Sequence, residues 1–246
     1  MAGTQMRRDT DAGLPSAARQ HLRWLAAGLA LGFTVPFVFA DLLDLPRDLY
    51  YAIYVASVGG FFAAWVRFTC QPVGAMLRRR WQLAVVLGLL AGGVLSVNVV
   101  RTEAETPGPD GFELAGAVLW RGVVYGVADG LLLSVFPILV VFAAAAGSRL
   151  RTHRSGLVVL GAAALVASLA MTAVYHTGYS DFRSQKLAKP VAGDVVWSIP
   201  TLVTLNPLGA PIAHAGMHVI AVLHSYETDT FLPPHELGGS PETSGP

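Results

Sequence analysis

Two histidines near the C-terminal end of the chain have the side-chain type and the spacing for metal chemistry. His214 and His218 stand four residues apart in His-Ala-Gly-Met-His, and residues at this spacing share one face of an α-helix. Two imidazoles on one face can reach a single metal ion. Both lie in an apolar segment, where polar side chains are costly without partners. We therefore expect them to bind a metal ion, with zinc as the cofactor.

A third histidine, His176, follows another apolar run. It can supply a third ligand if the C-terminal half of the last apolar segment returns to the same side of the membrane. Three neutral histidines leave an open position for water, and zinc acidifies such a water to a pKa of about 7. The remaining four histidines lie in polar segments or on another helix face, and we expect them to be solvated: His21, His153, His224 and His235.

Charged residues also occur inside an apolar run of membrane-spanning length. Arg121, Tyr125 and Asp129 follow one another at four-residue spacing and form a polar stripe on one side of the predicted helix. An ionised side chain in the middle of a lipid-facing helix costs roughly 2.5 to 3.5 kcal/mol. We therefore expect the stripe to face protein or water, in a hydrated pocket that Arg121 shares with the histidines.

Catalytic roles follow from these residue types. Arg121 is expected to orient a substrate or stabilise an oxyanion, and Asp129 and Glu113 are candidate catalytic carboxylates. Asp181 and Asp194, expected in an outer loop, are further candidates for a general base. In the structural alternative, Arg121 binds exposed backbone carbonyls of the last segment, and Asp129 lies near the inner surface beside a basic loop.

Composition identifies the class of protein that must position these residues. Hydrophobic residues make up 53% of the chain and charged residues only 13%, against about 25% charged residues in a soluble domain. Apolar runs of about 20 residues match a hydrocarbon core of about 30 Å. The sequence predicts an all-α, polytopic transmembrane helix bundle over residues 22–225. A polar N-terminal segment, 1–21, and a polar, disordered tail, 226–246, flank it.

Charge and cysteine content exclude several classes of function. A net charge of +1 provides no basic field for nucleic acid, so no nucleic-acid partner is expected. Cys70 is the only cysteine, which excludes an intrachain disulfide and a thiolate metal cluster. The expected partners are the lipid bilayer and a membrane-embedded peptide or lipid substrate.

Five regular spans and one interrupted segment are predicted. The last apolar region, Val195 to His224, contains three prolines, which predict two helical halves joined by a non-helical break. Backbone of this kind must be buried in protein or line a hydrated cavity. Whether the second half crosses or re-enters the membrane stays open. The regular spans are Leu22 to Ala40, Tyr50 to Val66, Trp81 to Val100, about Leu114 to Ala146, and Gly156 to Tyr175.

Arginine distribution predicts the orientation. Clusters of arginine precede the first span and follow the second and fourth, so the N-terminus is expected in the cytoplasm and the protein in the plasma membrane. Loops 41–49, 101–113 and 176–193 are then outside. Tyrosines at the outer ends of the spans, Tyr50, Tyr51 and Tyr175, agree with this frame as interfacial aromatic residues.

Glycines repeat every four residues in the fourth span. Gly122, Gly126 and Gly130 form one small-residue stripe, which lets helix backbones approach closely in lipid. The same spacing occurs in the first and third spans. We therefore expect the fourth span to be central to the bundle. A helix-mediated oligomer is a further expectation.

Motif order adds a resemblance to a known family. Trp120-Arg121-Gly122, a helix that ends in His176, and a proline-rich approach to His214 resemble, over roughly residues 113–220, the CPBP family of intramembrane metalloproteases and related immunity proteins. The resemblance implies a metal-dependent membrane peptidase in which Arg121, His176 and His214 belong to the site.

The chain departs from that family's pattern at several positions. Gly116 and Ala117 stand where the family has a pair of glutamates, Thr172 stands in place of a phenylalanine, and His218 replaces Asn or Asp. The late His-x-x-x-His is also similar to that of multi-span hydrolases of the ceramidase type.

Taken together, the residues favour a metal-dependent intramembrane hydrolase that acts on a peptide or lipid. A carrier or channel is the first alternative, with Arg121, Asp129 and the broken backbone from Asn206 to Pro211 along a polar pathway. Two histidines on facing helices could instead bind haem. The last alternative is a structural or accessory membrane protein.

Overall fold

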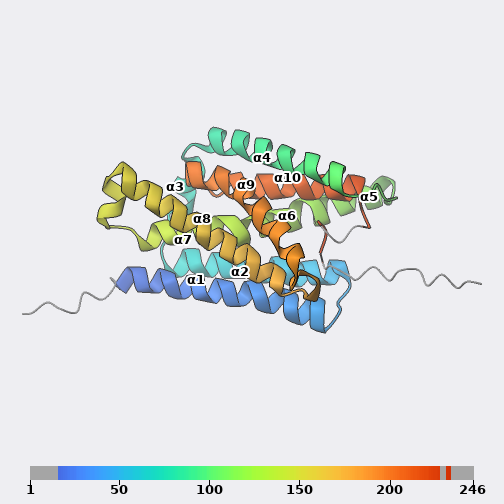
Figure 1. Ribbon diagram of the computed structural model, residues 1–246, viewed down its shortest axis with the longest axis horizontal. Helices are drawn as coiled ribbons and strands as arrows, with labels where there is room; N and C mark the ends of the chain where they lie inside the picture. Colours follow the sequence, from blue (N-terminus) through green and yellow to red (C-terminus); the bar gives the residue numbers. More distant parts are fainter. Residues whose placement is uncertain (1–15, 228–230, 234–246) are drawn as a thin grey trace, which may run out of the picture.

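A computed structural model describes residues 16–227 and 231–233 of the chain. Within these residues the protein is a bundle of helices, and the predicted all-α fold is confirmed (Figure 1). Most of the predicted polar N-terminal segment and of the predicted C-terminal tail lies outside the described residues. The first helix already begins at Ser16, inside the segment that was expected to be polar and separate.

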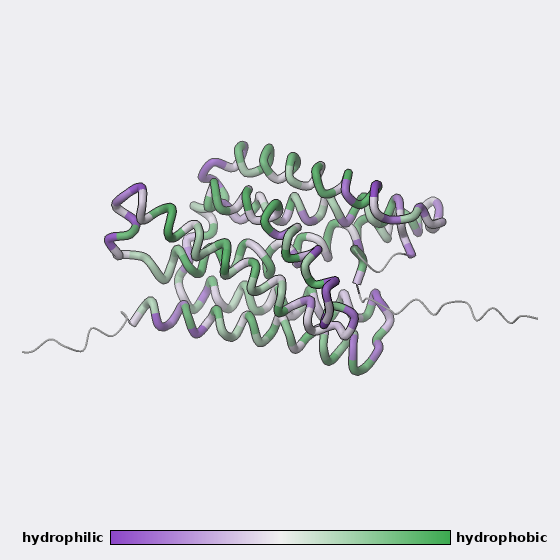
Figure 2. The backbone as a smooth tube through the Cα atoms, in the orientation of Figure 1, coloured by the Kyte–Doolittle hydropathy of each residue, from purple (hydrophilic) through white to green (hydrophobic). Residues whose placement is uncertain are grey.

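Five helical elements are long and apolar enough to cross a membrane, which confirms the five regular spans of a multi-pass membrane protein. Hydrophilic residues gather mainly at the ends of these elements, as Figure 2 shows. The elements are α1 (Ser16–Val35) with η1 (Pro36–Leu42), α2 (Arg47–Phe68), α4 (Trp81–Thr102), the fourth span Gly111–Ala144, and α8 (Arg154–Thr177).

The fourth span is the central helix of the bundle. In its most apolar window 72% of the residues are buried, against 28% to 33% in the other four spans. It runs without interruption through α5 (Gly111–Ala117), η2 (Val118–Val124), α6 (Tyr125–Gly130), η3 (Leu131–Val135) and α7 (Phe136–Ala144). Its η2 and η3 segments are π-helical turns, which occur frequently at functional sites.

The last apolar region forms a helical hairpin and not one interrupted span. Its first helix, α9 (Ala188–Thr204), begins seven residues before the predicted start at Val195, so the predicted outer loop 176–193 is shorter than expected. The second helix is α10 (Gly209–His224). At 1.5 Å per residue, helices of this length extend about 25 Å, close to the thickness of the hydrocarbon core.

The break between α9 and α10 is anchored at one end of the bundle. The side-chain nitrogen of Asn206 lies 2.9, 3.1 and 2.6 Å from the carbonyl oxygens of Met76, Leu77 and Arg79, which belong to α3 (Val73–Arg78) and the residue after it. The predicted break is therefore confirmed, and its polar backbone is buried against protein as expected.

At its other end α10 returns to the side where α8 finishes. The carbonyl of His224 accepts from the amide of Thr106 at 3.1 Å, and the His224 ring contacts the carbonyl of Glu103. The second half of the last region therefore crosses the bundle. This is the arrangement that allows His176, in the last turn of α8, to approach α10.

The two ends of the bundle differ in charge. One, here called the arginine-rich end, contains the start of α1, the α3 segment, the connection from α7 to α8 and the break before α10. At the other, here called the ion-pair end, carboxylates pair with arginine or lysine: Asp48 with Arg121, Asp41 with Arg183, Asp181 with Lys186 and Glu103 with Lys189.

Glycines hold α10 against the central helix. A Cβ atom built on Gly126 would lie 2.7 Å from the Cα of Ala215, and one on Gly130 would lie 2.6 Å from the Cα of Pro211. No side chain fits between backbones this close. The close helix packing predicted along the stripe of Gly122, Gly126 and Gly130, here called the glycine seam, is therefore confirmed. On the opposite face of α10, Gly88 of α4 approaches the Gly209 carbonyl in the same way.

A glycine substitution tests this seam. Gly126→Ala is expected to lower the free energy of unfolding in detergent by about 1 to 3 kcal/mol, because the new methyl group meets the backbone of α10. Gly116→Ala in the same helix is the matched control, since a Cβ there has no atom within 4 Å, and it should leave stability unchanged or raise it by up to about 1 kcal/mol. Equal effects of the two variants would contradict close packing at Gly126.

Candidate metal centre

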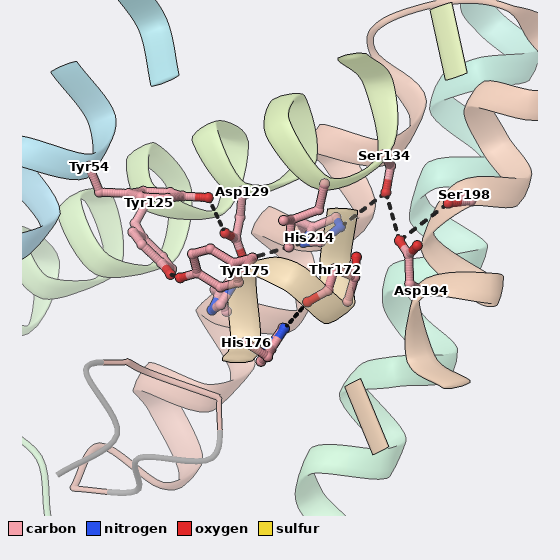
Figure 3. A network of polar contacts seen from close by, with 12 residues as sticks. Tyr54, Tyr125, Asp129, Ser134, Thr172, Tyr175, His176, Asp194, Ser198 and His214 are labelled. Atoms are coloured by element: carbon pink, nitrogen blue, oxygen red, sulfur yellow. Dashed lines mark hydrogen bonds and ion pairs between the residues drawn. The ribbon is translucent and has the colours of Figure 1, made fainter. Parts of the chain in front are cut away.

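Three side chains from two helices meet in the centre of the bundle. Asp129 of α6 has its Oδ2 atom 3.3 Å from Nε2 of His218 and 3.7 Å from Nδ1 of His214. One ligand atom from each of the three residues lies within 4.8 Å of the others. All three side chains are buried, and Figure 3 shows their surroundings.

The seam explains why these groups meet. Gly126 and Gly130 flank Asp129 in sequence and bring α10 into backbone contact on both sides of the carboxylate. His214 and His218 are one turn apart on α10 and therefore point toward the same neighbour. Close helix packing thus places a carboxylate opposite two imidazoles.

The separations fit ligands of one metal ion. Zinc binds imidazole nitrogen at about 2.0 to 2.1 Å and carboxylate oxygen at about 2.0 to 2.2 Å, so tetrahedral ligand atoms lie roughly 3.3 to 3.4 Å apart. The two carboxylate–imidazole distances, 3.3 and 3.7 Å, lie at or slightly above this value. Two nitrogens and one oxygen form a donor set suited to a transition metal.

Ser134 and Asp129 contact different nitrogens of the His214 ring. The Ser134 hydroxyl donates to Oδ1 of Asp194 at 3.1 Å and also contacts Nε2 of His214 at 3.5 Å. Nδ1 of His214 faces the Asp129 carboxylate at 3.7 Å, and it has no hydrogen-bond partner among the described residues. A metal ion between these two groups could bind both.

Neighbouring side chains fix the orientation of the site. Tyr54 donates a 2.8 Å hydrogen bond to Oδ1 of Asp129. The indole of Trp197 stacks on His214 with ring centroids 4.4 Å apart, and Tyr125 meets the edge of His218 at 5.1 Å. Partners of this kind hold metal ligands in one rotamer.

His176 lies beside the cluster of Asp129, His214 and His218 but is not part of it. Its Nδ1 contacts the Thr172 carbonyl at 2.8 Å, and because a carbonyl only accepts, the proton is on Nδ1. The ring lines the same cavity as Asp129 and His218. The structure thus brings two predicted ligands, His214 and His218, together with Asp129, for which the sequence favoured a catalytic role.

Arg121 and Glu113 lie elsewhere. Arg121 donates from Nε and Nη2 to the two carboxylate oxygens of Asp48 at 2.9 and 2.8 Å, and its guanidinium lies over the Tyr226 ring. Neither Arg121 nor the exposed Glu113 lines the cavity. The expected pocket shared by Arg121 and the histidines is therefore wrong, as is the alternative in which Arg121 binds the broken segment. Asp48, at the start of α2, supplies a partner that spacing within the fourth span could not reveal.

Asp194 is buried and not in an outer loop. It lies on α9, fully buried, and accepts hydrogen bonds from Ser134 at 3.1 Å and Ser198 at 3.2 Å. The correction follows from the earlier start of α9, which carries this residue into the bundle. Asp194 therefore connects through Ser134 to His214, whereas Asp181 pairs with Lys186 at the ion-pair end.

The cavity has a volume of about 60 Å³, enough for several water molecules. It reaches the surface at the ion-pair end, where the half-exposed Lys189 forms part of its lining. Buried polar atoms without hydrogen-bond partners among the described residues include Nδ1 of His218 and Nε1 of Trp197, both in lining residues. Most other lining side chains are apolar: Leu95, Leu133, Phe182, Met217, Trp197 and Phe231.

Sequence reasoning missed a buried tyrosine cluster next to the site. The hydroxyl of Tyr175 lies 2.5 Å from that of Tyr125, 2.7 Å from that of Tyr179 and 3.3 Å from that of Tyr50. Tyr50, Tyr51 and Tyr175 are at most 1% exposed, so their expected place in an interfacial belt is wrong. The four-residue spacing of Tyr50 with Tyr54, and of Tyr175 with Tyr179, was the available signal.

Comparisons with known proteins leave the site geometry as the basis for a function. No protein-family model matches the chain, and neither a curated protein nor a solved structure matches it. The arrangement itself can hold a divalent cation next to a narrow, apolar cavity that opens at one end of a membrane bundle.

Removal of the central tyrosine hydroxyl tests the cluster. Tyr175→Phe is expected to lower the free energy of unfolding in detergent by about 1 to 3 kcal/mol, because Tyr125 loses its hydrogen-bond partner in a buried site. Tyr226→Phe is the control: this hydroxyl is not part of the cluster, and phenylalanine retains the ring over Arg121. If both variants unfold like the wild type, the hydroxyl network adds nothing to stability.

Proposed function

We propose that this multi-pass membrane protein binds a divalent metal ion, zinc, between Asp129, His214 and His218 and uses it to hydrolyse a peptide or lipid in the membrane. The observation that carries the proposal is the buried cluster of Asp129, His214 and His218, whose ligand atoms lie within 4.8 Å of one another. A bound cation would contact all three groups. Nδ1 of His214 has no hydrogen-bond partner among the described residues, and a buried polar atom without a partner is costly.

Three protein ligands leave a coordination position for water. A zinc ion bound in this way lowers the pKa of its water to about 7 and thereby supplies a nucleophile at neutral pH. Tyr54 would hold the Asp129 carboxylate, and Ser134 with Asp194 would hold His214, in the manner of outer-shell partners in zinc enzymes.

His176 is the remaining ionisable group of the cavity wall. With its proton on Nδ1, bound to the Thr172 carbonyl, its Nε2 atom is the basic nitrogen. This nitrogen can either take up a proton from water or complete the ligand set. The two roles differ in outcome: His176→Ala should retain metal and lose hydrolysis in the first case, and lose metal in the second.

The cavity supports an apolar substrate. Its walls are formed largely by aliphatic and aromatic side chains, and its mouth lies at the ion-pair end beside Lys189. The carrier alternative receives less support, because Asn206 lies against α3 at the arginine-rich end while Arg121 is paired at the opposite end. The resemblance to the CPBP family stays a prediction. The distances between Asp129, His214 and His218 do not depend on it.

Metal analysis tests the proposal directly. Purified wild-type protein should contain about one zinc per chain by plasma mass spectrometry. Asp129→Asn and the double variant His214→Ala His218→Ala should lose the bound zinc. Both variants should also fail to hydrolyse a panel of fluorogenic peptides and lipids. His153→Ala, an exposed residue at the arginine-rich end, is the control and should keep both the zinc and the hydrolysis.

Ser134→Ala separates a metal site from a plain ion pair. Loss of an outer-shell partner is expected to weaken metal affinity by about 10- to 100-fold, measured by competition with a chelator, while the fold is retained. Metal-free wild-type protein, or a zinc content that the Asp129 and histidine substitutions leave unchanged, would show that this assignment is wrong.

We also propose that the arginine-rich end faces the cytoplasm, because clustered arginine beside membrane spans favours that side. The single cysteine offers a natural probe, since Cys70 is exposed at this end. In intact cells Cys70 should react only with a membrane-permeant maleimide. A Cys70→Ser Glu105→Cys variant should react with an impermeant one. The reverse pattern would contradict the orientation.

A further inference from the structure

A pair of grooves at the arginine-rich end lies far from the metal centre. One, of about 680 Å³, runs between α8 and α9; the other, of about 500 Å³, lies between α1, α3 and α7. Both are lined by Arg79, Arg151, Phe142 and Leu205. The grooves therefore meet at two arginines.

Among the described residues, the charged side chains at this end are arginines. Every carboxylate of the described residues lies at the ion-pair end or inside the bundle, and none of the ion pairs among them involves an arginine of this end. A cluster of guanidinium groups at the edge of a membrane bundle attracts an anion. The arginines described at this end are Arg19, Arg23, Arg67, Arg78, Arg79, Arg80, Arg149, Arg151 and Arg154.

The structure fixes the backbone that carries two of these arginines. The carbonyl of Arg79 accepts a 2.6 Å hydrogen bond from Asn206, and Arg80 donates to the Val203 carbonyl in the last turn of α9. The loop is therefore tied to the turn between α9 and α10. The exposed Arg79 lines both grooves.

The larger groove continues from the arginines along lipid-facing helix surface. Its wall on α8 extends from Leu157 through Gly161 to Leu165, about 12 Å at 1.5 Å per residue. A Cβ on Gly161 would have no atom within 4 Å, so the groove is open there. An elongated apolar chain fits such a wall better than a soluble anion does.

We propose that these grooves bind an anionic glycerophospholipid. Its phosphate lies between Arg79 and Arg151, where guanidinium groups can bind phosphate oxygens through paired hydrogen bonds, and one acyl chain lies along α8 and α9. The arginines match the negative charge of the lipid phosphate, and the apolar groove wall matches an acyl chain. This inference does not depend on the proposed hydrolase function.

Lipid titration with native mass spectrometry tests the site. Delipidated protein should bind phosphatidylglycerol more tightly than phosphatidylcholine with the same acyl chains. The double variant Arg79→Gln Arg151→Gln should bind phosphatidylglycerol at least about tenfold more weakly. Arg149→Gln Arg154→Gln is the matched control, because it removes the same charge at the same end from residues that line neither groove, and it should change binding by less than about twofold.

Other results would overturn the proposal. Equal weakening by the two double variants would indicate a diffuse charge effect, and equal binding of both lipids would exclude recognition of the phosphate headgroup charge. Stabilisation by inorganic phosphate that equals stabilisation by phosphatidylglycerol in a thermal unfolding assay would point to a soluble anion. Unchanged melting of both variants in detergent without lipid confirms that their folds are intact.

Discussion

The backbone contact between the central helix and α10 is the constraint on which the rest of the structure depends. Gly126 and Gly130 remove side chains from the interface, so that Asp129, between them, meets His214 and His218 of the facing helix. In lipid, helices gain little from hydrophobic association, and close packing of small residues supplies the attraction. The same contact therefore stabilises the bundle and assembles its most polar group.

Polar groups inside this bundle are arranged around that contact. Tyr54 bonds the carboxylate from one side, while Ser134 and Asp194 reach the imidazole from the other. Buried polar groups need hydrogen-bond partners, and a network that spans five helical elements also fixes their relative positions. The lipid-exposed surfaces of α4 and α8 are, by contrast, made largely of valine, leucine and alanine.

Much of the fold could be predicted from the sequence, because membrane spans are defined by length and hydropathy alone. The five regular spans and the glycine seam followed from patterns within single helices. The pairing of Arg121 with Asp48 could not be predicted in this way, since it depends on which helices are neighbours. The same limit applies to Asp194: prolines indicated a break, but no local signal placed the start of α9 at Ala188.

Helix α10 is fastened at both ends, by Asn206 against the loop after α3 and by His224 against the segment that follows α4. A helix held in this way cannot easily adjust the distance between its two imidazoles and the carboxylate opposite. Fixed distances between the three side chains favour small metal ions, because larger cations such as calcium require longer bonds and more oxygen ligands. At the proposed metal site, rigidity of the scaffold, and not donor chemistry alone, would then decide which metal ion binds.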